Sequence, residues 1–392
     1  MPPHTPSLSR REALGTALIS AGGLASAAGT QESTIPASSA SSPAASLTFG
    51  RKIRVGMVGL EGHPGVVLDV IASHPELDLV AIARDTVPVA GITRRPEFKN
   101  TRIHDEYRQM FATEDLDVLA ACNTNGHRAE VILAAAAKGW HVVAEKPVAM
   151  TVAALAAVRE ATAKQGLTFS SLLPMRYEPP LYTMGMMVRE GAIGDVLLMS
   201  GQKSYKLGSR PEWFKQRSLY GSTMLWIGVH QLDLMHWMSS QRFTAVYSYE
   251  QNVKAPGFGE MENITGAVMH LENGGVATLS MDYHRPGSAS THGDDRLRVV
   301  GTKGILEYRI ADGLMLLREG SSGVEHPVLR HPPLPLFLDF LAEAYLGQQM
   351  LIRPAEIFHV VETLLAARES DLQRKRVEVG EIHQISNKYK YI

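Results

Sequence analysis

Residues 52–85, KIRVGMVGLEGHPGVVLDVIASHPELDLVAIARD, contain the pattern that decides the fold. The apolar run 53–58 predicts a buried strand, and a glycine-rich turn follows it. Residues from about 64 to 73 predict a helix, and 79–83 predict a second strand. Together these segments form one β-α-β unit, so we expect a parallel sheet.

The same alternation continues along the chain. Residues 118–122 predict a strand, about 128–138 an Ala-rich helix and 141–144 another strand. The connections are short, which is typical of an α/β fold whose ligands bind beyond the C-terminal ends of parallel strands. The single cysteine, Cys122, falls at the end of a predicted strand, and we interpret it as a buried strand residue.

The turn after the first strand carries regularly spaced glycines. Gly59, Gly62 and Gly65, with Leu60 between them, stand where a dinucleotide-binding fold needs a tight turn and close approach to a pyrophosphate. The spacing is G-x-x-G-x-x-G rather than G-x-G-x-x-G, because Glu61 occupies the place of the second glycine. A strand-to-helix turn without a phosphate is the alternative interpretation.

The end of the second predicted strand should select the ribose of a dinucleotide. An acid there accepts a hydrogen bond from a 2'-hydroxyl, whereas an arginine favours a 2'-phosphate. The sequence offers Arg84 followed by Asp85, so both NAD and NADP stay open as the cofactor.

A charged pair follows the predicted strand 141–144 in the segment AEKPVAM, residues 144–150. Glu145 and Lys146 therefore lie on the ligand side of the sheet. A lysine there can hydrogen-bond a reacting hydroxyl and favour its deprotonation while hydride leaves the carbon, and Pro147 restrains the residue before it. The alternative is a surface ion pair of little energetic value.

Composition narrows the class of partner. The 392 residues include 39 Lys and Arg against 40 Asp and Glu, a formal net charge of -1, so no large basic face predicts binding to nucleic acid or an anionic membrane. A small-molecule partner is favoured. The chain has no H-E-x-x-H and no Cys-x-x-Cys sequence, so we expect no metal.

The N-terminal residues 1–29 differ from the rest. Arg10 and Arg11 precede an apolar Ala, Gly and Leu stretch, which resembles a twin-arginine export signal with cleavage near Ala27 and predicts a periplasmic or otherwise exported protein. A disordered tail with a chance arginine pair is the alternative. The stretch is too short and glycine-rich for a membrane span, and residues 30–50 predict a flexible linker.

Several motifs extend over most of the chain from residue 51. They are IRVGMVGL (53–60), KGWHVVAEKPVAMT (138–151), MRYEPP (175–180), REGAIGDVL (189–197), IGVHQLDLMHW (227–237) and GTKGILEY (301–308). Together they resemble the Gfo/Idh/MocA family of glucose-fructose oxidoreductase and inositol dehydrogenase. The resemblance implies a Rossmann domain, 51–170, and an α+β domain, 171–392, with a large open, mostly antiparallel sheet.

The second half agrees with that architecture. Alternating residues predict neighbouring strands without helices between them, and ENGG at 272–275 predicts a hairpin turn. Late helices near 337–345 and 355–370 are expected to pack back on the first domain. The open sheet also predicts a homo-oligomer.

The resemblance also implies the catalytic residues. Trp226, His230 and Asp233 are spaced i, i+4 and i+7 on a predicted helix and share one face. In dehydrogenases of this family a Lys, a His and an Asp four residues before the His act together, so Lys146 and His230 are the predicted catalytic residues. The Asp position is Trp226, which suits stacking on a sugar or plain core packing. Asp233 is expected to fix the helix or the histidine.

The remaining expectations form two sets. The residues expected to bind the cofactor are Gly59, Leu60, Gly62, Gly65, Arg84, Asp85, Asn123, Asn125, Glu145, Lys146 and Arg176. The residues expected to bind the substrate are Lys146, Tyr177, Trp226, His230 and Asp233.

The functional hypothesis is an NAD(P)-dependent oxidoreductase of a sugar or polyol. Export of an enzyme that needs a cytosolic cofactor favours a cofactor that stays bound and is regenerated in each cycle. One alternative is a redox-neutral NAD-dependent glycosidase or lyase that works by transient oxidation. Another is a non-catalytic sugar- or nucleotide-binding relic, suggested by Trp226, Glu61 and NTNG at 123–126, where the family commonly has Thr-Pro-Asn.

Overall fold

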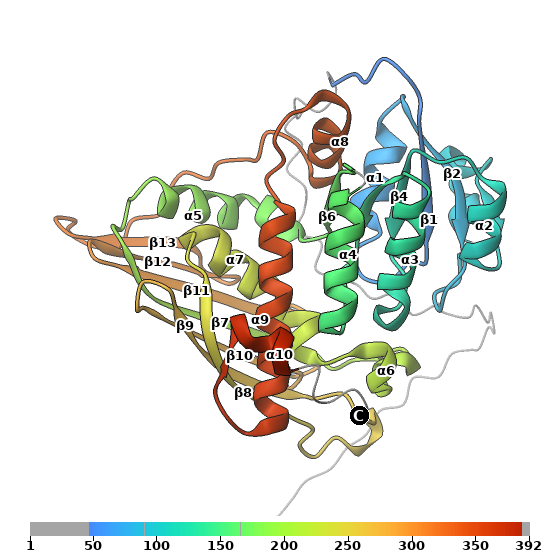
Figure 1. Ribbon diagram of the computed structural model, residues 1–392. Helices are drawn as coiled ribbons and strands as arrows, with labels where there is room; N and C mark the ends of the chain where they lie inside the picture. Colours follow the sequence, from blue (N-terminus) through green and yellow to red (C-terminus); the bar gives the residue numbers. More distant parts are fainter. Residues whose placement is uncertain (1–46, 90, 165, 386–392) are drawn as a thin grey trace, which may run out of the picture. The chain divides into compact units, whose positions relative to one another are not determined.

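The computed structural model describes residues 47–89, 91–164 and 166–385 (Figure 1). The predicted export signal and the predicted linker up to residue 46 lie outside the described residues. The last part of that linker is attached to the domain that follows. Leu47 and Phe49 pack against its core, and the Phe49 amide donates to the Glu76 carboxylate at 2.6 Å.

The first domain is built on a parallel sheet of six strands in the order β3-β2-β1-β4-β5-β6, which confirms the predicted Rossmann fold. Its strands are β1 (Ile53–Val58), β2 (Leu77–Ala83), β3 (Arg102–His104), β4 (Val118–Ala121), β5 (His141–Ala144) and β6 (Phe169–Ser171). The strand order reverses between β1 and β4, and ligands of such sheets bind at that reversal.

Helices cover both faces of this sheet, which is why its strands are apolar without alternation. The helices are α1 (Gly65–Ser73), α2 (Tyr107–Thr113), α3 (Asn125–Ala137) and α4 (Val152–Lys164). Helix α3 begins three residues earlier than predicted. Its first residue, Asn125, is a poor helix former, but its side-chain amide donates to the Tyr220 carbonyl at 2.8 Å, which fixes it there.

The second domain contains a mixed sheet of eight strands in the order β13-β12-β11-β7-β10-β9-β8-β14. Its strands are β7 (Val196–Tyr205), β8 (Phe243–Gln251), β9 (Ile264–Leu271), β10 (Val276–Asp282), β11 (Gly293–Gly301), β12 (Gly304–Arg309), β13 (Gly313–Arg318) and β14 (Val377–Glu378). The pair β7 and β10 is parallel and the other neighbours are antiparallel, as the predicted mostly antiparallel sheet requires. The predicted ENGG turn joins β9 to β10.

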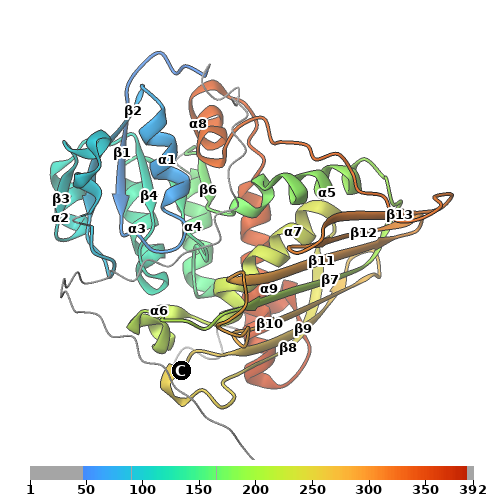
Figure 2. The ribbon, with the colours of Figure 1, turned by 180° about the vertical axis from the view of Figure 1, so that it is seen from behind.

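Helices cover one face of the large sheet. The helices after β6 are α5 (Pro179–Arg189), α6 (Arg217–Tyr220), α7 (Val229–Ser239), α8 (Leu336–Leu346), α9 (Pro354–Gln373) and α10 (Ile382–Ile385). Helices α5, α7 and α9 lie against the sheet (Figure 1), and the view from behind shows its strands uncovered on the other face (Figure 2). Exposed apolar side chains, among them Leu198, Tyr249 and Val268, mark this open face.

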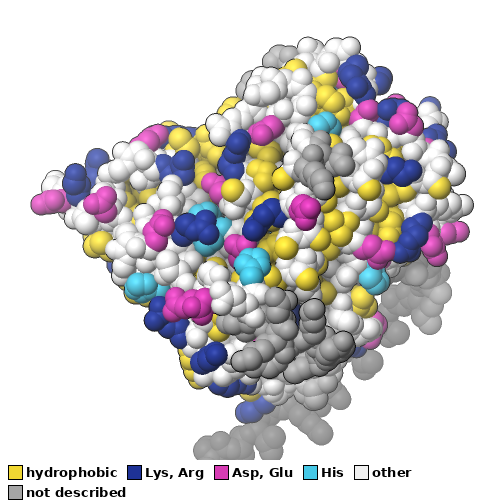
Figure 3. All heavy atoms as spheres, in the orientation of Figure 1, with side chains coloured by type: hydrophobic (Ala, Val, Ile, Leu, Met, Phe, Trp, Pro, Cys, Tyr) yellow, Lys and Arg dark blue, Asp and Glu magenta, His cyan; other side chains and the backbone are white. Residues whose placement is uncertain are grey.

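The two late helices connect the domains. Helix α8 contacts α1, and α9 contacts α4 and β6 of the first sheet as well as β8 of the second. On the helix-covered side, charged residues of both signs are interspersed (Figure 3), in line with the near-neutral net charge. None of the described helices is both long and apolar enough to cross a membrane.

Candidate active site

The glycine-rich turn lies at the C-terminal end of β1, where the sheet order reverses. Gly59 and Gly62 have φ angles of 71° and 72°, which side-chain-bearing residues rarely adopt. The Gly59 amide donates to the Ala83 carbonyl at 3.0 Å and the Glu61 amide to the Cys122 carbonyl at 2.7 Å. These bonds hold the turn against β2 and β4 and leave the N-terminus of α1 open to a ligand.

The turn fits the phosphates of a dinucleotide. Within the described residues, the amides of Leu60 and Gly62 have no hydrogen-bond acceptor, and no side chain caps the start of α1 at Gly65. Such amides and the positive end of the helix dipole attract an anion. Glu61 is buried beside them and accepts from the Thr86 hydroxyl. Burial, and then the charge of Asp85, raise its pKa, which weakens the repulsion of a phosphate.

Glu145 follows β5 and is completely buried against this turn. One carboxylate oxygen, Oε1, lies 2.6 Å from both the amide nitrogen and Nδ1 of His63, and Oε2 accepts from the Lys146 amide at 3.0 Å. A Cβ atom at Gly62 would overlap this carboxylate. Burial acts to raise the pKa of Glu145, but His63, Lys146 and Arg128 outweigh it and hold that pKa below its usual value.

Lys146 is held by an aromatic residue of the second domain. Its ammonium lies 3.5 Å from the centre of the Trp226 ring and donates to the Trp226 carbonyl at 3.1 Å. The peptide bond from Lys146 to Pro147 is cis. Trp226 in turn packs edge-on against the rings of Trp213 and Phe214, each 5.6 Å away between centroids. The indole therefore positions the ammonium of Lys146.

His230 lies in the same cluster. It is 5% exposed, and its Nδ1 atom has no hydrogen-bond partner in the described part of the chain. Its ring stands perpendicular to that of His63, with 5.3 Å between the ring centroids. Burial, and then the positive charges of Lys146, Lys203 and His63, hold the pKa of His230 well below its usual value. The imidazole is therefore neutral at pH 7 and can accept a proton.

The helix that carries these residues begins with a wider turn than predicted. Residues Met224–Gly228 form a π-helical turn, η6, which runs directly into α7. Such turns are frequent at functional sites, because they shift side chains relative to a regular helix. Trp226 and His230 both lie near Lys146, as the spacing predicts, whereas Asp233 faces a different set of residues.

Asp233 forms a buried ion pair with Arg176. Arg176 donates to both Asp233 oxygens, at 2.8 and 2.5 Å, and also to Glu356 at 2.6 Å and to the Leu351 carbonyl at 3.1 Å. These bonds join α7, α9 and the segment after β6. They agree with the expectation that Asp233 fixes its helix, but they occupy Arg176, which was expected to bind the cofactor. Contact of either residue with a ligand stays a prediction.

The polar residues after β2 and β4 form a second buried network. The Asp85 carboxylate accepts from the Thr124 amide at 2.6 Å, and Arg84 turns outward to Asp105 at 2.9 Å. Oδ1 of Asn123 is buried without a partner among the described residues. Asp85 and Asn123 therefore border the turn, and Arg84 is engaged with Asp105, while contact of these three residues with a cofactor stays a prediction.

Arg128 organises this second network. It is fully buried and donates to the Asn125 side chain and to the Pro147 carbonyl, both at 2.9 Å, and to the Asn123 carbonyl. Asn125 is thereby engaged by Arg128 and Tyr220, so its predicted cofactor contact gains no support from this geometry.

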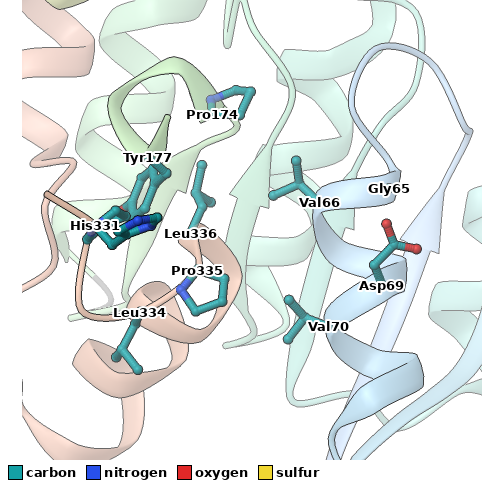
Figure 4. Close-up of a pocket in the computed structure, with 11 residues that line it drawn as sticks. Gly65, Val66, Asp69, Val70, Pro174, Tyr177, His331, Leu334, Pro335 and Leu336 are labelled. Atoms are coloured by element: carbon teal, nitrogen blue, oxygen red, sulfur yellow. The ribbon is translucent and has the colours of Figure 1, made fainter. Parts of the chain in front are cut away.

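An apolar cavity of about 460 Å³ adjoins the turn at Gly65 (Figure 4). Val66 and Val70 of α1 point across it toward Leu336, and Tyr177 lies on its far side. The Tyr177 hydroxyl donates to Asp339 at 2.7 Å, so the ring borders the cavity while the hydroxyl is used by the protein. Contact of Tyr177 with a substrate stays a prediction.

Three residues of the site were not predicted. His63 lies inside the glycine turn, where the sequence pattern drew attention only to the glycines. Arg128 and Lys203 are fully buried cations, and Lys203 is paired with Asp295 at 2.6 Å. Within the ranges that the structure describes, no group of three or more His, Cys, Asp or Glu side chains is arranged to hold a metal ion.

Comparison with known proteins places these features in a family. Residues 53–172 match the oxidoreductase family with an NAD-binding Rossmann fold, and residues 182–307 match the GFO/IDH/MocA C-terminal domain. Inositol 2-dehydrogenase of Salmonella paratyphi B is 26% identical over 147 residues, 37% of this chain and 42% of that protein. The chain spans about half the length of the curated relatives it matches.

Solved structures match over more of the chain. The structure of a Thermotoga maritima protein described as an oxidoreductase is 31% identical with a TM-score of 0.77, and the match covers 83% of this chain and 100% of that one. Levoglucosan dehydrogenase in complex with NADH and levoglucosan has the same fold, with a TM-score of 0.72 at 20% identity, over 84% of this chain and 100% of that one. The chain belongs to the Gfo/Idh/MocA family of NAD(P)-dependent oxidoreductases.

Proposed function

We propose that the protein oxidises a hydroxyl group of a sugar or polyol, with Lys146 and His230 as its catalytic residues. The observation that carries this proposal is the meeting of Lys146, from the end of β5, with Trp226 and His230, from the start of α7. This cluster lies beside the dinucleotide turn through the shared contacts of Glu145. The names of inositol 2-dehydrogenase and levoglucosan dehydrogenase support the substrate class.

The first domain would hold the dinucleotide. The open amides of Leu60 and Gly62 and the start of α1 suit its pyrophosphate, and the partly exposed Asp85 carboxylate suits a ribose hydroxyl. When bound, the nicotinamide ring supplies the hydride acceptor. The acid at position 85 favours NAD over NADP, since Arg84 is engaged with Asp105.

Lys146 and His230 act on different atoms of the substrate hydroxyl. The Lys146 ammonium can donate to the hydroxyl oxygen and so stabilise the developing alkoxide. Neutral His230 can accept the hydroxyl proton, because its lowered pKa keeps a ring nitrogen unprotonated at pH 7. The Trp226 face is occupied by Lys146, so this indole positions the lysine rather than stacking on a sugar.

Two finer points belong to this proposal. The arginine pair Arg10 and Arg11 supports export of the folded protein, and an exported enzyme gains from a cofactor that stays bound and is regenerated within each cycle. The open sheet face supports a homo-oligomer, because several apolar side chains are exposed there, among them Val268 at 53% and Tyr249 at 47%.

A redox-neutral glycosidase or lyase is the second candidate. The observation that favours it is the 2.6 Å contact between Glu145 and Nδ1 of His63 beside His230, since an elimination next to a transient ketone needs an additional acid–base group. Such an enzyme would consume a glycoside without net change in nicotinamide absorbance.

The two candidates are separated by following absorbance at 340 nm and product formation together. The assay uses myo-inositol, levoglucosan and a 4-nitrophenyl glycoside with the wild type, Lys146→Met and His230→Asn. The oxidoreductase proposal expects reduced nicotinamide to accumulate in the wild type, with a loss of about 100-fold or more in both variants. Nitrophenol release without nicotinamide reduction would replace it by the glycosidase. Equal rates in wild type and variants would refute the assigned residues.

A further inference from the structure

Trp226 contributes no carboxylate to the site, but Glu145 brings a buried carboxylate to the glycine-rich turn. Glu145 contacts His63 through one oxygen, which lies 2.6 Å from Nδ1 and 2.6 Å from the amide nitrogen of the same residue. Two contacts to one residue fix both the backbone and the ring of His63. With Nδ1 facing the carboxylate, Nε2 is the ring nitrogen turned away from Glu145.

The His63 ring is directed toward the catalytic histidine. Its centroid lies 5.3 Å from that of His230, and the ring planes are nearly perpendicular at 87°. The His63 side chain retains 10% exposure, whereas the carboxylate of Glu145 behind it has none. His63 therefore lies between His230 and the buried carboxylate, and it is the most exposed of the three.

This arrangement addresses a difficulty at His230. A proton taken from the substrate hydroxyl makes His230 a buried cation. The charges of Lys146 and Lys203 lie close to it and lower the pKa of His230 further than burial alone does. The imidazolium is therefore costly and must lose its proton before the next cycle. A neighbouring imidazole backed by an anion can hold a positive charge at lower cost.

We propose that His63, oriented by Glu145, is a proton-relay residue that exchanges protons with His230. A bound nicotinamide would supply the acceptor for the hydride of the carbon that bears the hydroxyl. In the oxidation direction the O–H proton passes to His230, then to His63 and finally to water. The reduction direction reverses these steps. This inference rests on the proposed function, because it assigns the proton path of that reaction.

The charged groups around the relay come from four elements. Glu145 and Lys146 follow β5, Lys203 lies on β7, His230 lies on α7, and His63 belongs to the turn before α1. Glu145 is the anion in contact with His63. Its removal is therefore expected to disturb His63 first and His230 second.

The test compares His63→Asn, His63→Ala and Glu145→Gln with the control His326→Asn, which changes an exposed histidine. Asparagine keeps a donor near the position of Nδ1 and so preserves the bond to Glu145, but it does not titrate. We expect His63→Asn to bind NAD with a dissociation constant within about twofold of the wild type while kcat at pH 7 falls about 100-fold. The control is expected to match the wild type.

Two measurements distinguish a proton relay from a purely structural role of His63. Added imidazole should raise the kcat of His63→Ala by at least about 10-fold, because it can enter the space left by the His63 ring and carry the proton instead. By NMR of labelled imidazoles without cofactor, the pKa of His230 should rise in His63→Asn, since His63 acts to lower that pKa.

The outcomes separate this inference from the proposed function. A wild type that reduces NAD, with unchanged kcat and pH profile in His63→Asn and no rescue of His63→Ala, overturns the relay and leaves the oxidoreductase intact. A wild type that neither binds nor reduces a dinucleotide overturns the proposed function. In that case an unchanged His230 titration in His63→Asn also rejects the coupling of the two histidines.

Discussion

The ammonium of Lys146 lies 3.5 Å from the centre of the Trp226 ring, so an indole holds the lysine at the position where the sequence resemblance led us to expect an aspartate. A cation over an aromatic face is attracted by the ring quadrupole, and the attraction is larger when water is excluded. Lys146 is 3% exposed, so water is largely excluded here. The lysine is therefore positioned without being paired to a carboxylate of α7.

The first prediction concerns this contact. Replacing Trp226 by Leu keeps an apolar side chain but removes the aromatic face, so we expect the free energy of unfolding to fall by about 2 kcal/mol or more. Trp226→Phe keeps a ring and should lose less. Urea denaturation of both variants measures the difference, and equal losses would show that packing rather than the cation–aromatic contact matters.

A second prediction concerns Gly62. An alanine there must adopt a φ of 72° and its Cβ overlaps the Glu145 carboxylate, so we expect a loss of about 1–3 kcal/mol in stability and strongly weakened NAD binding. Gly65→Ala is the stability control, because its Cβ has only an ordinary contact, 3.6 Å from Asp69. Thermal unfolding and calorimetric titration with NAD check both effects, and a Gly62→Ala protein as stable as Gly65→Ala would contradict this geometry.

The third prediction is that the stability of the protein depends on pH through Glu250, a buried carboxylate at the start of η6. Glu250 accepts from the Met224 amide at 3.2 Å, and Glu262 accepts from the Thr223 amide at 3.0 Å, so two buried carboxylates hold the start of this turn. Burial, and then the charge of Glu262, raise the pKa of Glu250 to about 8. The folded protein therefore binds this proton more tightly than the unfolded chain does.

The sign follows from that difference. The stabilisation is complete below the unfolded pKa of Glu250 and is lost as the pH rises through about 8, with a slope of at most about 1.4 kcal/mol per pH unit. Glu250→Gln should remove this part of the decline. Urea denaturation at pH 6 and pH 9 tests it, with the exposed Glu319→Gln as control. The same decline in Glu250→Gln as in the wild type would contradict the assignment.

A fourth prediction concerns the open face of the large sheet. Val268→Glu places a charge in the exposed apolar surface. The dissociation constant of a homo-oligomer that uses this face should therefore rise by at least about 10-fold. Leu372→Glu, at another exposed apolar position, is the matched control. Light scattering after size-exclusion chromatography gives the mass of each. Dissociation by both variants, or by neither, would argue against this face.

A fifth prediction concerns export. Replacing Arg10 and Arg11 by lysines should retain the precursor in the cytosol of a host with twin-arginine transport, because the arginine pair is what that pathway reads. Cell fractionation and immunoblotting measure the distribution. Unchanged export of the double variant would assign these arginines to a tail without a targeting role.

Much of the first domain followed from sequence periodicity. The strand predicted at 141–144 is β5 as observed, because a run of buried apolar residues leaves little choice of boundary. Strand β7 was not predicted, although it is central in the second sheet. Its sequence includes the polar residues Lys203 and Gly201. A Cβ at Gly201 would crowd the end of the Met235 side chain, and the ammonium of Lys203 donates to Asp295 of another strand and to the Met175 sulfur.

The site was predictable where a motif named a residue, and not where a partner lies far away in the sequence. Lys146 and His230 follow from motifs, but the indole contact that joins Lys146 to Trp226 depends on the packing of two domains. The pairing of Arg176 with Asp233 and Glu356 likewise joins three separate segments. His63 was hidden because only its tertiary contact with Glu145 distinguishes it from any other turn residue.

The central claim is that this chain binds a nicotinamide dinucleotide for redox chemistry at Lys146 and His230. The most direct measurement is mass spectrometry of the small molecules released when the purified protein is denatured, together with titration of the refolded protein with NAD and NADP. The account predicts NAD, released at about one per chain or bound on titration. Neither a released nucleotide nor binding of either cofactor would contradict it and would favour a sugar-binding relic of the fold.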